Sequence, residues 1–405
     1  MALLNGTTSP TVKVYLDAGN RTANKFIFAY SLLGGTDTLG SNAYTPFATL
    51  LQLPAADVRS VSIRRGRTRE DQTFQAGQLT FIMDNVSGNY DPQKNVATYR
   101  GSDGKSILCG STGVRVTATY SGTETVIYSG YIEQINLVDD FAPTVEFVCT
   151  DAITKISKQT FNYKPSWGTE IDADVVTEVL GKIGWPSTFI NTTHAGDALV
   201  SPELNVTDSA YNICTTIAQM QMGKFFIDRF GKPCLISYSY TQLPDVFMYL
   251  SDQRPPQDPY GRPTIEYDNI SISGGEKYIV NAITINNTTG DFTRVNGGSV
   301  SRYGSIPKSV VGYHKFSADA IDAAVNMANY WGTPEYRIET VEFDGFGLTQ
   351  WLDILKTELG DGLFLYRQSA YNSTPTLYYC GIESLNHDIT ASSWRVSMNL
   401  SPVPL

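Results

Sequence analysis

The chain has 405 residues, a formal net charge of -10 at pH 7 and a hydrophobic content of 41%, with 34 glycines and 19 prolines. That length is enough for about two to four domains, and the composition indicates a turn-rich globular protein with more strand than helix. The acidic balance argues against a surface built to bind nucleic acid or an anionic membrane. It leaves open an acidic channel through which nucleic acid passes without binding.

No stretch approaches the roughly 18 apolar residues of a membrane-spanning helix, so we expect no membrane insertion by this chain. The first eight residues lack the basic segment and apolar core of a signal peptide, so we expect synthesis in a host cytoplasm without secretion by that route. The five cysteines are odd in number and widely spaced, and buried reduced thiols are favoured over a disulfide or metal framework. They are Cys109, Cys149, Cys214, Cys234 and Cys380.

Residues 1–160 are predicted to form mainly strands, because apolar and polar residues alternate with period two between turn-forming segments. The predicted strands are 58–63, 78–85, 114–120, 125–129 and a further one that begins in Tyr128–Asn136. In the first of them, alternation predicts Val58 on one face and Val61 with Ile63 on the other. This strand leads into a loop that contains Arg64, Arg65, Arg67 and Arg69.

A short sequence pattern occurs twice, about a domain apart. Residues 128–136 read YSGYIEQIN, and residues 379–386 read YCGIESLN, which is the same frame less one residue. Each copy leads through a few polar residues into an alternating run, 143–149 in the first and 394–400 in the second, so each is predicted to be a hairpin. The repeat therefore predicts a duplicated β unit.

Residues 161–262 change to a mixed pattern. Asp172–Gly184 has Val176, Val179, Leu180 and Ile183 at helical spacing, which predicts an amphipathic helix with an Asp cap. A second helix is predicted from Thr207 or Asp208 to Gly223, followed by two short strands within 224–237. The proline-rich segment 253–259 is predicted to be a linker or an extended crossing.

Residues 263–405 return to a strand pattern, with strands predicted at 276–287 and 337–343 and a polar excursion from Gly290 to Gly304. A helix is predicted from a Ser317 cap to Gly332, and a short amphipathic turn at 348–359 precedes the strand 360–366 and the terminal hairpin. We therefore expect domains at 1–160, 161–262 and 263–405.

Three motifs in order, at Ser62–Arg67, Phe74–Thr80 and Asp84–Pro92, resemble the N-terminal β-domain of minor tail proteins of long-tailed bacterial viruses. The helix followed by Lys224–Gly231 is similar to the middle segment of the baseplate (tail tip) hub family. The Tyr-Gly step at 303–304 before an Ala-rich helix, and the closing tryptophan strand, are also similar to that family. The resemblance touches all three parts of the chain as loose motifs, not as close identity.

This resemblance implies a β-rich α+β fold with two related β-barrel domains and an inserted α+β middle region. It implies a structural virion protein at the tail tip, a homotrimer whose six barrels join a six-fold tail tube to a three-fold tip. Its implied partners are the distal tail or tail tube protein, the tape measure protein and the tail fibre or spike proteins, with DNA only in transit through a gated channel. The alternatives are a distal tail protein that forms a hexameric ring and, less favoured, a tail-associated cell-wall or capsule hydrolase or a carbohydrate-binding module.

Given this resemblance, we expect Arg64, Arg65, Arg67 and Arg69 to form an inter-subunit contact that seeks acidic partner groups. A solvated loop is the alternative, and nucleic-acid binding is disfavoured because acidic residues follow and no aromatic residues are interleaved.

No constellation of residues predicts catalysis, a cofactor or a metal ion. His194, His314 and His387 lie in separate segments without ligand spacing, and no nucleophile motif is present. The adjacent pair Asp139 and Asp140 is predicted to be a solvated turn, since glycosidase carboxylates must face each other across a bond. We therefore expect a protein that is not an enzyme and that carries no cofactor.

Overall fold

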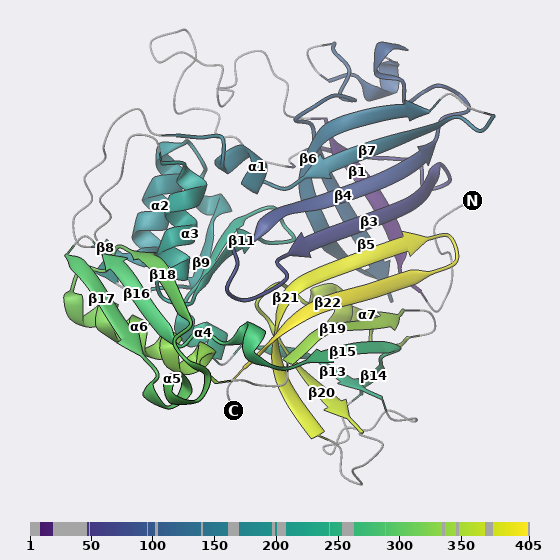
Figure 1. Ribbon diagram of the computed structural model, residues 1–405. Coiled ribbons are helices and arrows are strands. Elements are labelled where there is room, and N and C mark those ends of the chain that lie inside the picture. The colour runs from purple at the N-terminus through teal and green to yellow at the C-terminus, as the bar shows by residue number, and fades with distance from the viewer. Residues whose placement is uncertain are drawn as a thin grey trace, which may run out of the picture.

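The computed structural model describes residues 9–18, 47, 49–94, 96–101, 104–138, 141–160, 170–196, 199–200, 208–242, 244–252, 263–287, 289–333, 337–345, 348–368 and 376–403. Within these residues the fold is a β-rich α+β fold, as the sequence predicted (Figure 1). The proline-rich segment 253–259 and the pair Asp139–Asp140 lie outside the described residues.

The first sheet unit is antiparallel, with the strand order β3-β4-β7-β6-β5-β1-β2. Its strands are β1 (Thr11–Asp17), β2 (Leu50–Gln52), β3 (Val58–Gly66), β4 (Gln75–Asp84), β5 (Gly113–Tyr120), β6 (Thr123–Val138) and β7 (Thr144–Thr150). Two 3-10 turns, Pro92–Lys94 and Ala97–Tyr99, lie between β4 and β5. The first predicted hairpin is confirmed, because β6 and β7 pair directly.

Two details of the first unit differ from the sequence prediction. Residues 123–138 form one long strand, β6, and not two successive strands. In β3, Val58, Val61 and Ile63 are all buried, because a register shift between Val58 and Ser60 moves Val58 to the face of the other two. A bulge of this kind breaks strict alternation, and the sequence alone gives no signal for it.

The middle region packs helices against a small sheet. Its elements are α1 (Ile153–Ile156), β8 (Glu170–Ile171), α2 (Asp172–Lys182), a 3-10 turn (Ser187–Phe189), β9 (Asn191–His194), β10 (Leu199–Val200), α3 (Ala210–Gln219), β11 (Lys224–Ile227), β12 (Pro233–Ile236) and α4 (Tyr238–Gln242). The predicted helix at 172–184 is confirmed as α2, although its N-cap is Ile171 and not an aspartate. The N-cap of α3 is Ser209, whose side chain accepts a hydrogen bond from the Asn212 N–H.

The second sheet unit has the strand order β15-β19-β22-β21-β20-β13-β14. Its elements are β13 (Val246–Ser251), β14 (Ile265–Glu266), β15 (Asn269–Ser273), β19 (Arg337–Asp344), α7 (Trp351–Lys356), β20 (Gly362–Arg367), β21 (Thr376–Thr390) and β22 (Trp394–Pro402). The predicted terminal hairpin is confirmed by the pairing of β21 with β22.

A peripheral unit is inserted between β15 and β19 and has its own small core, in which α6 packs on a three-stranded sheet. Its elements are a 3-10 turn (Glu276–Tyr278), β16 (Ala282–Asn287), β17 (Gly290–Val295), α5 (Gly297–Tyr303), β18 (Pro307–Gly312) and α6 (Ser317–Trp331). The sequence predicted α6 but not β17 or α5, because residues 290–304 are polar and glycine-rich. α5 is initiated by Asn296, whose side chain accepts from the Ser299 N–H.

The two sheet units are joined edge to edge, because β3 pairs antiparallel with β21 from Ser60 to Gly66. The result is an eight-strand array in the order β6-β7-β4-β3-β21-β22-β19-β15, visible as one continuous sheet in Figure 1. The strand order in the described residues does not close into a barrel, so the predicted pair of separate β-barrels is not seen here. The domain bounds that we expected from the sequence stay a prediction.

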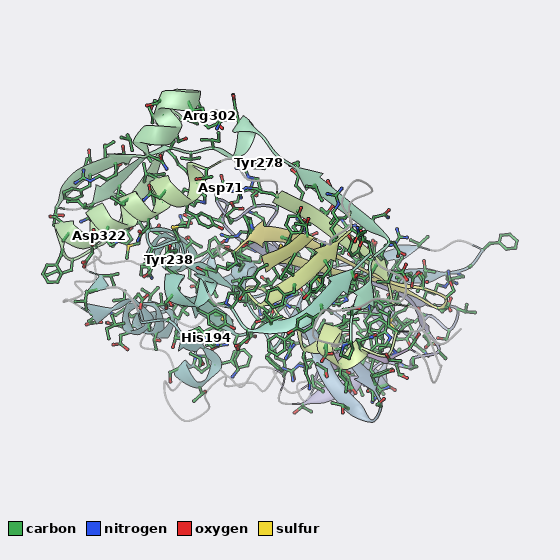
Figure 2. The ribbon with its side chains drawn as sticks, turned by 90° about the horizontal axis from the view of Figure 1, so that it is seen from below. Asp71, His194, Tyr238, Tyr278, Arg302 and Asp322 are labelled. Atoms are coloured by element: carbon green, nitrogen blue, oxygen red, sulfur yellow. The ribbon has the colours of Figure 1, made fainter. Side chains whose placement is uncertain are left out.

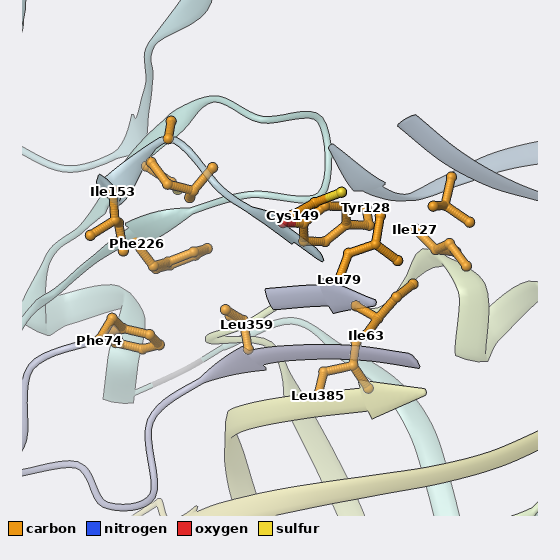
Figure 3. Close-up of a cluster of buried hydrophobic side chains, with 14 of the residues drawn as sticks. Ile63, Phe74, Leu79, Ile127, Tyr128, Cys149, Ile153, Phe226, Leu359 and Leu385 are labelled. Carbon is orange, nitrogen blue, oxygen red and sulfur yellow. The ribbon is translucent and has the colours of Figure 1, made fainter. Parts of the chain in front are cut away.

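The main core runs continuously across this joint (Figure 3). Ile63 from β3, Leu79 from β4 and Leu385 from β21 are all buried there, and Phe226 from the middle region packs on Phe74 with ring centroids 5.3 Å apart. Because apolar burial is the main favourable term in folding, this shared core fixes the two sheet units and the middle region in one arrangement.

Candidate functional site

The four arginines of the predicted contact have very different surroundings. Arg64 is exposed at the end of β3, Arg69 is half-buried, and Arg65 and Arg67 are each only 6% exposed. A buried arginine needs a partner, so the two buried side chains show where this segment is anchored. The groups that bind Arg65 and Arg67, described next, lie outside β3.

Arg67 meets a buried carboxylate of the second sheet unit. Its Nε donates to Glu383 Oε2 over 2.6 Å, and Glu383 Oε1 accepts from Lys224 Nζ over 2.8 Å and from Ser401 Oγ over 2.7 Å. The Arg67 backbone N–H also donates to the Glu383 carbonyl over 2.9 Å. Arg67, Lys224 and Glu383 come from the first sheet unit, the middle region and the second sheet unit, so this ion triad fastens the three together.

The triad keeps Glu383 ionised although the side chain is fully buried. Burial by itself would raise the pKa of Glu383, but the charges and hydrogen bonds of Arg67 and Lys224 lower that pKa to about 2. The Arg67 guanidinium also lies over the Phe74 ring, 4.5 Å from its centroid.

Arg65 makes the second anchor. Its Nη2 donates to the Ile227 carbonyl over 2.8 Å and to Glu358 Oε1 over 2.6 Å. The other oxygen of Glu358 accepts from the Arg229 N–H over 2.7 Å. Here again an arginine of the first unit binds both the middle region and the second unit.

The β3–β4 loop (residues 67–74) continues to the peripheral unit. Asp71 accepts from Arg69 and lies 3.4 Å from Lys308 Nζ on β18, while Glu70 pairs with Arg337 on β19. Arg69 also lies over the Tyr278 ring, and Figure 2 shows Asp71 and Tyr278 close together at the edge of the peripheral unit. Sequence reasoning found these arginines but missed their acidic partners, which are as far as 316 residues away.

A cavity of about 210 Å³ lies beside this loop, and its wall includes Arg67, Asp71, Lys308 and Trp331. The charged groups among these four are already engaged in ion pairs within the chain. The cavity is therefore a gap where the loop, α3, β18 and α6 meet.

His387, His314 and four of the five cysteines are buried, whereas His194 is half-buried and stacks on Tyr240. His387 is buried against Trp394, whose Nε1 donates to His387 Nδ1 over 3.2 Å, and burial lowers the pKa of His387 to about 4. All five cysteines are free; Cys109 is half-buried and the other four are buried. Among the residues that the structure describes, no group of three or more His, Cys, Asp and Glu side chains is placed to hold a metal ion. No helix in the same residues is long and apolar enough to cross a membrane.

Beside the half-buried Glu358 lies a buried carboxylate, Asp361, which accepts from the Glu358 N–H over 2.7 Å. Burial, with a smaller contribution from the charge of Glu358, raises the pKa of Asp361 to about 7, although that hydrogen bond and the charge of Arg229 act to lower it. This folded-state pKa lies above the value of about 3.9 for an unfolded aspartate. The stability linked to Asp361 is therefore complete below about pH 4 and is lost as the pH rises through about 7.

We expect Asp361→Asn to be less sensitive to pH than the wild type. In urea unfolding, the wild-type free energy of unfolding should fall between pH 5 and pH 8, and the variant should fall less, by on the order of 1–4 kcal/mol. Asp291→Asn, at an exposed carboxylate on β17, is the matched control and should follow the wild type. Equal pH dependence in the wild type and Asp361→Asn would contradict the prediction.

No protein-family model and no curated protein sequence matches this chain. Its structure, however, is similar over 97% of its length to a tail protein from Neisseria meningitidis MC58, with a TM-score of 0.58, 10% identity and 96% of that chain covered. It is also similar over 97% of its length to the 43 kDa tail protein of prophage MuSo2 from Shewanella oneidensis, with a TM-score of 0.53, 10% identity and 98% of that chain covered. The resemblance to phage tail proteins that the motifs indicated is thus confirmed at the level of the fold.

Proposed function

We propose that this chain is a structural protein of a bacteriophage tail, located in the virion as the hub of the tail tip. It would act as a homotrimer that joins the six-fold tail tube to a three-fold tip. The support comes from the fold likeness to two tail proteins and from one internal observation, the pairing of two similarly ordered sheet units through β3 and β21.

The internal observation carries the proposal because of symmetry. The order β3-β4-β7-β6-β5 in the first unit is matched by β15-β19-β22-β21-β20 in the second, with every neighbouring pair antiparallel. Three chains with two such units each would present six similar surfaces to a six-fold ring, as matching patches in a closed assembly require. In that ring each unit would supply one segment of the barrel wall.

The proposed partners are the distal tail or tail tube protein on one side and fibre or spike proteins on the other, with the tape measure protein above the channel. The role is mechanical: the hub narrows the channel, anchors the receptor-binding parts, and opens for DNA when these parts engage the host. The net charge of -10 suits a channel through which DNA moves without binding. No cofactor and no catalytic step is part of this proposal.

Of the four arginines, Arg64 is the one with an exposed side chain, so it is the residue best placed for a contact with a neighbouring subunit. Arg65, Arg67 and Arg69 already bind groups of their own chain. An inter-subunit role of the whole run stays a prediction.

The molar mass of the purified protein tests the proposal. Light scattering over a concentration series should give three copies. Six copies would contradict the trimer and favour the alternative, a distal tail protein in a hexameric ring. If the protein is monomeric in solution, the test moves to assembled tails, where three-fold density from this chain is expected at the distal end of the tube.

A further inference from the structure

The eight-strand array ends in two strand edges that have no partner strand among the described residues. One is the outer edge of β6 from Gln134 to Val138, beyond the point at which β5 stops pairing with it at Tyr131. The other is the outer edge of β15, which among the described strands pairs with β19 alone. An open edge presents unpaired N–H and C=O groups and is a template for another strand.

The edge of β6 is equivalent to an edge that is covered inside the same chain. β6 corresponds to β21 by strand order, and each has a register shift at the same point of the repeated pattern, between Ile132 and Gln134 and between Ile382 and Ser384. In β21, residues 384–390 follow this register shift, and β3 pairs with their outer edge. The segment 134–138 of β6 is the counterpart of 384–388.

Side chains at equivalent positions of β6 and β21 differ in burial, because β3 covers only the edge of β21. Leu385 and His387 on β21 are 3% and 2% exposed beneath the first unit, whereas Leu137, the counterpart of His387, is 40% exposed. Val138 is 48% exposed, but its counterpart Asp388 is exposed as well, so the contrast in burial rests on Leu137. The first sheet unit thus shows an apolar strip at a site that the second unit has covered.

Glutamates at the two register shifts show the same contrast. Glu383 is fully buried in the ion triad, whereas its counterpart Glu133 is exposed. A glutamate therefore stands at the same position in both copies of the pattern, and the fold buries only Glu383 within the chain.

The outer edge of β15 has the complementary character. β15 corresponds to β3, and its Ile270 takes the place of Val61, since both lie one strand outside an equivalent residue of β19 or β4. Val61 is 1% exposed beneath β21, while Ile270 is only half-buried and Asn269 and Ser271 are exposed. The edge of β3 that pairs with β21 therefore has a counterpart in the second unit, the outer edge of β15, that no described strand covers.

We propose that β15 of one copy of this chain pairs antiparallel with residues 134–138 of β6 in the next copy, repeating between copies the contact that β3 makes with β21 within one. The occupant is a second copy, because the internal joint already shows that these two kinds of edge fit each other. The contact is head-to-tail, so in a closed ring neither of these two edges stays open. The number of copies, three, rests on the proposed function; the strand pairing does not.

The register of the internal joint identifies residues that face each other across the new one. Ser62 lies opposite Asp388 in the chain, so their counterparts Ser271 and Val138 should lie opposite each other between copies. Directly opposed residues of antiparallel strands have Cα atoms about 4.5–5.5 Å apart, within the range of a disulfide.

Disulfide trapping tests this pairing. In a Cys109→Ser background, which removes the half-buried thiol, the double variant Ser271→Cys/Val138→Cys should form disulfide-linked trimers under mild oxidation. Mixing the two single variants should give linked dimers that neither forms alone. The matched control is Ser271→Cys/Val295→Cys, because Val295 is also an exposed strand valine but lies on β17; it should not be linked.

A second variant measures the contribution of the apolar strip. Leu137→Asp should weaken self-association by at least about tenfold, because its carboxylate would be buried at the joint, where the counterpart His387 is 2% exposed. Val295→Asp should leave it unchanged, and both should keep the wild-type circular dichroism and unfolding midpoint.

The outcomes separate the two proposals. A trimer without the 138–271 disulfide overturns the strand pairing and leaves the proposed function standing. Disulfide-linked rings of six copies, or open polymers, support the strand pairing and overturn the trimeric hub. A chain that stays monomeric and unlinked at high concentration overturns the pairing.

Discussion

Replacing Arg67 by methionine is expected to lower the free energy of unfolding by about 3–5 kcal/mol, the cost of leaving a buried charge without its partner. Glu383 is fully buried, and Arg67 is one of the two cations that hold its carboxylate. Methionine keeps much of the apolar length of the arginine, so the loss reports mainly on the ion triad. Urea unfolding followed by tryptophan fluorescence measures it.

Two controls make this result specific. Arg64→Met changes the exposed arginine at the end of β3, three residues before Arg67, and should alter stability by less than about 0.5 kcal/mol. The triple variant Arg67→Met/Lys224→Met/Glu383→Leu removes all three charges and should recover most of the loss, because apolar residues often replace a buried ion cluster without cost. A triple variant less stable than Arg67→Met would show that the triad does not account for the effect.

The same triad predicts an acid response. The folded-state pKa of Glu383, about 2, lies below the value near 4.3 for an unfolded glutamate. Its contribution is therefore present above about pH 4 and is lost as the pH falls through about 2. In Arg67→Met this acid-dependent loss should be smaller, since part of the cause of the low pKa has been removed.

Replacing Gly66 by alanine is expected to destabilise the chain by about 3–5 kcal/mol, through a clash at the joint between the two sheet units. A Cβ at this position would lie 2.2 Å from the Glu383 carbonyl oxygen and 2.5 Å from Ser384 Cα, and both are backbone atoms of β21. Because neither atom can move alone, the β3–β21 pairing must open to admit the methyl group. The unfolding midpoint and the protease sensitivity of the joint measure the effect.

Gly290→Ala separates this clash from backbone strain. Gly66 has a φ of +112° and Gly290 a φ of +131°, so both substitutions force an L-residue into an unfavourable backbone region. At Gly290 the nearest atom to the added Cβ is the Phe292 ring at 4.0 Å, an ordinary contact. Equal losses in the two variants would mean that strain alone explains the result and that the joint tolerates the methyl group.

The repeated pattern shows how one local sequence can have two tertiary roles. The segments that begin at Tyr128 and Tyr379 both form strands with a register shift at the same glutamate. Their outer edges differ only because β3 lies against the second and no described strand lies against the first. A glutamate exposed at one site is fully buried at the other, and no feature of the pattern itself distinguishes them.

Elements with a local signal could be predicted from the amino-acid sequence. Period-two alternation predicted both hairpins, and helical spacing predicted α2 and α6, because these periods follow directly from which side chains share a face. The bulge in β3 and the polar elements β17 and α5 escaped this reasoning, since their cause is a partner strand or a side-chain cap and not a periodic pattern. The motifs in all three parts of the chain indicated a tail-protein fold that the structural likeness supports.

The partners of the arginines and the contact between the two units could not be predicted from the sequence, because both depend on packing between distant segments. The sequence places Arg67 and Glu383 316 residues apart, and their pairing depends on the edge-to-edge contact of β3 with β21. Burial changes an arginine from a solvated charge into an obligatory partner of a carboxylate, and burial is set by the packing of the whole chain. For the same physical reason the open edges of β6 and β15 could be recognised only after the covered edge of β21 had been seen.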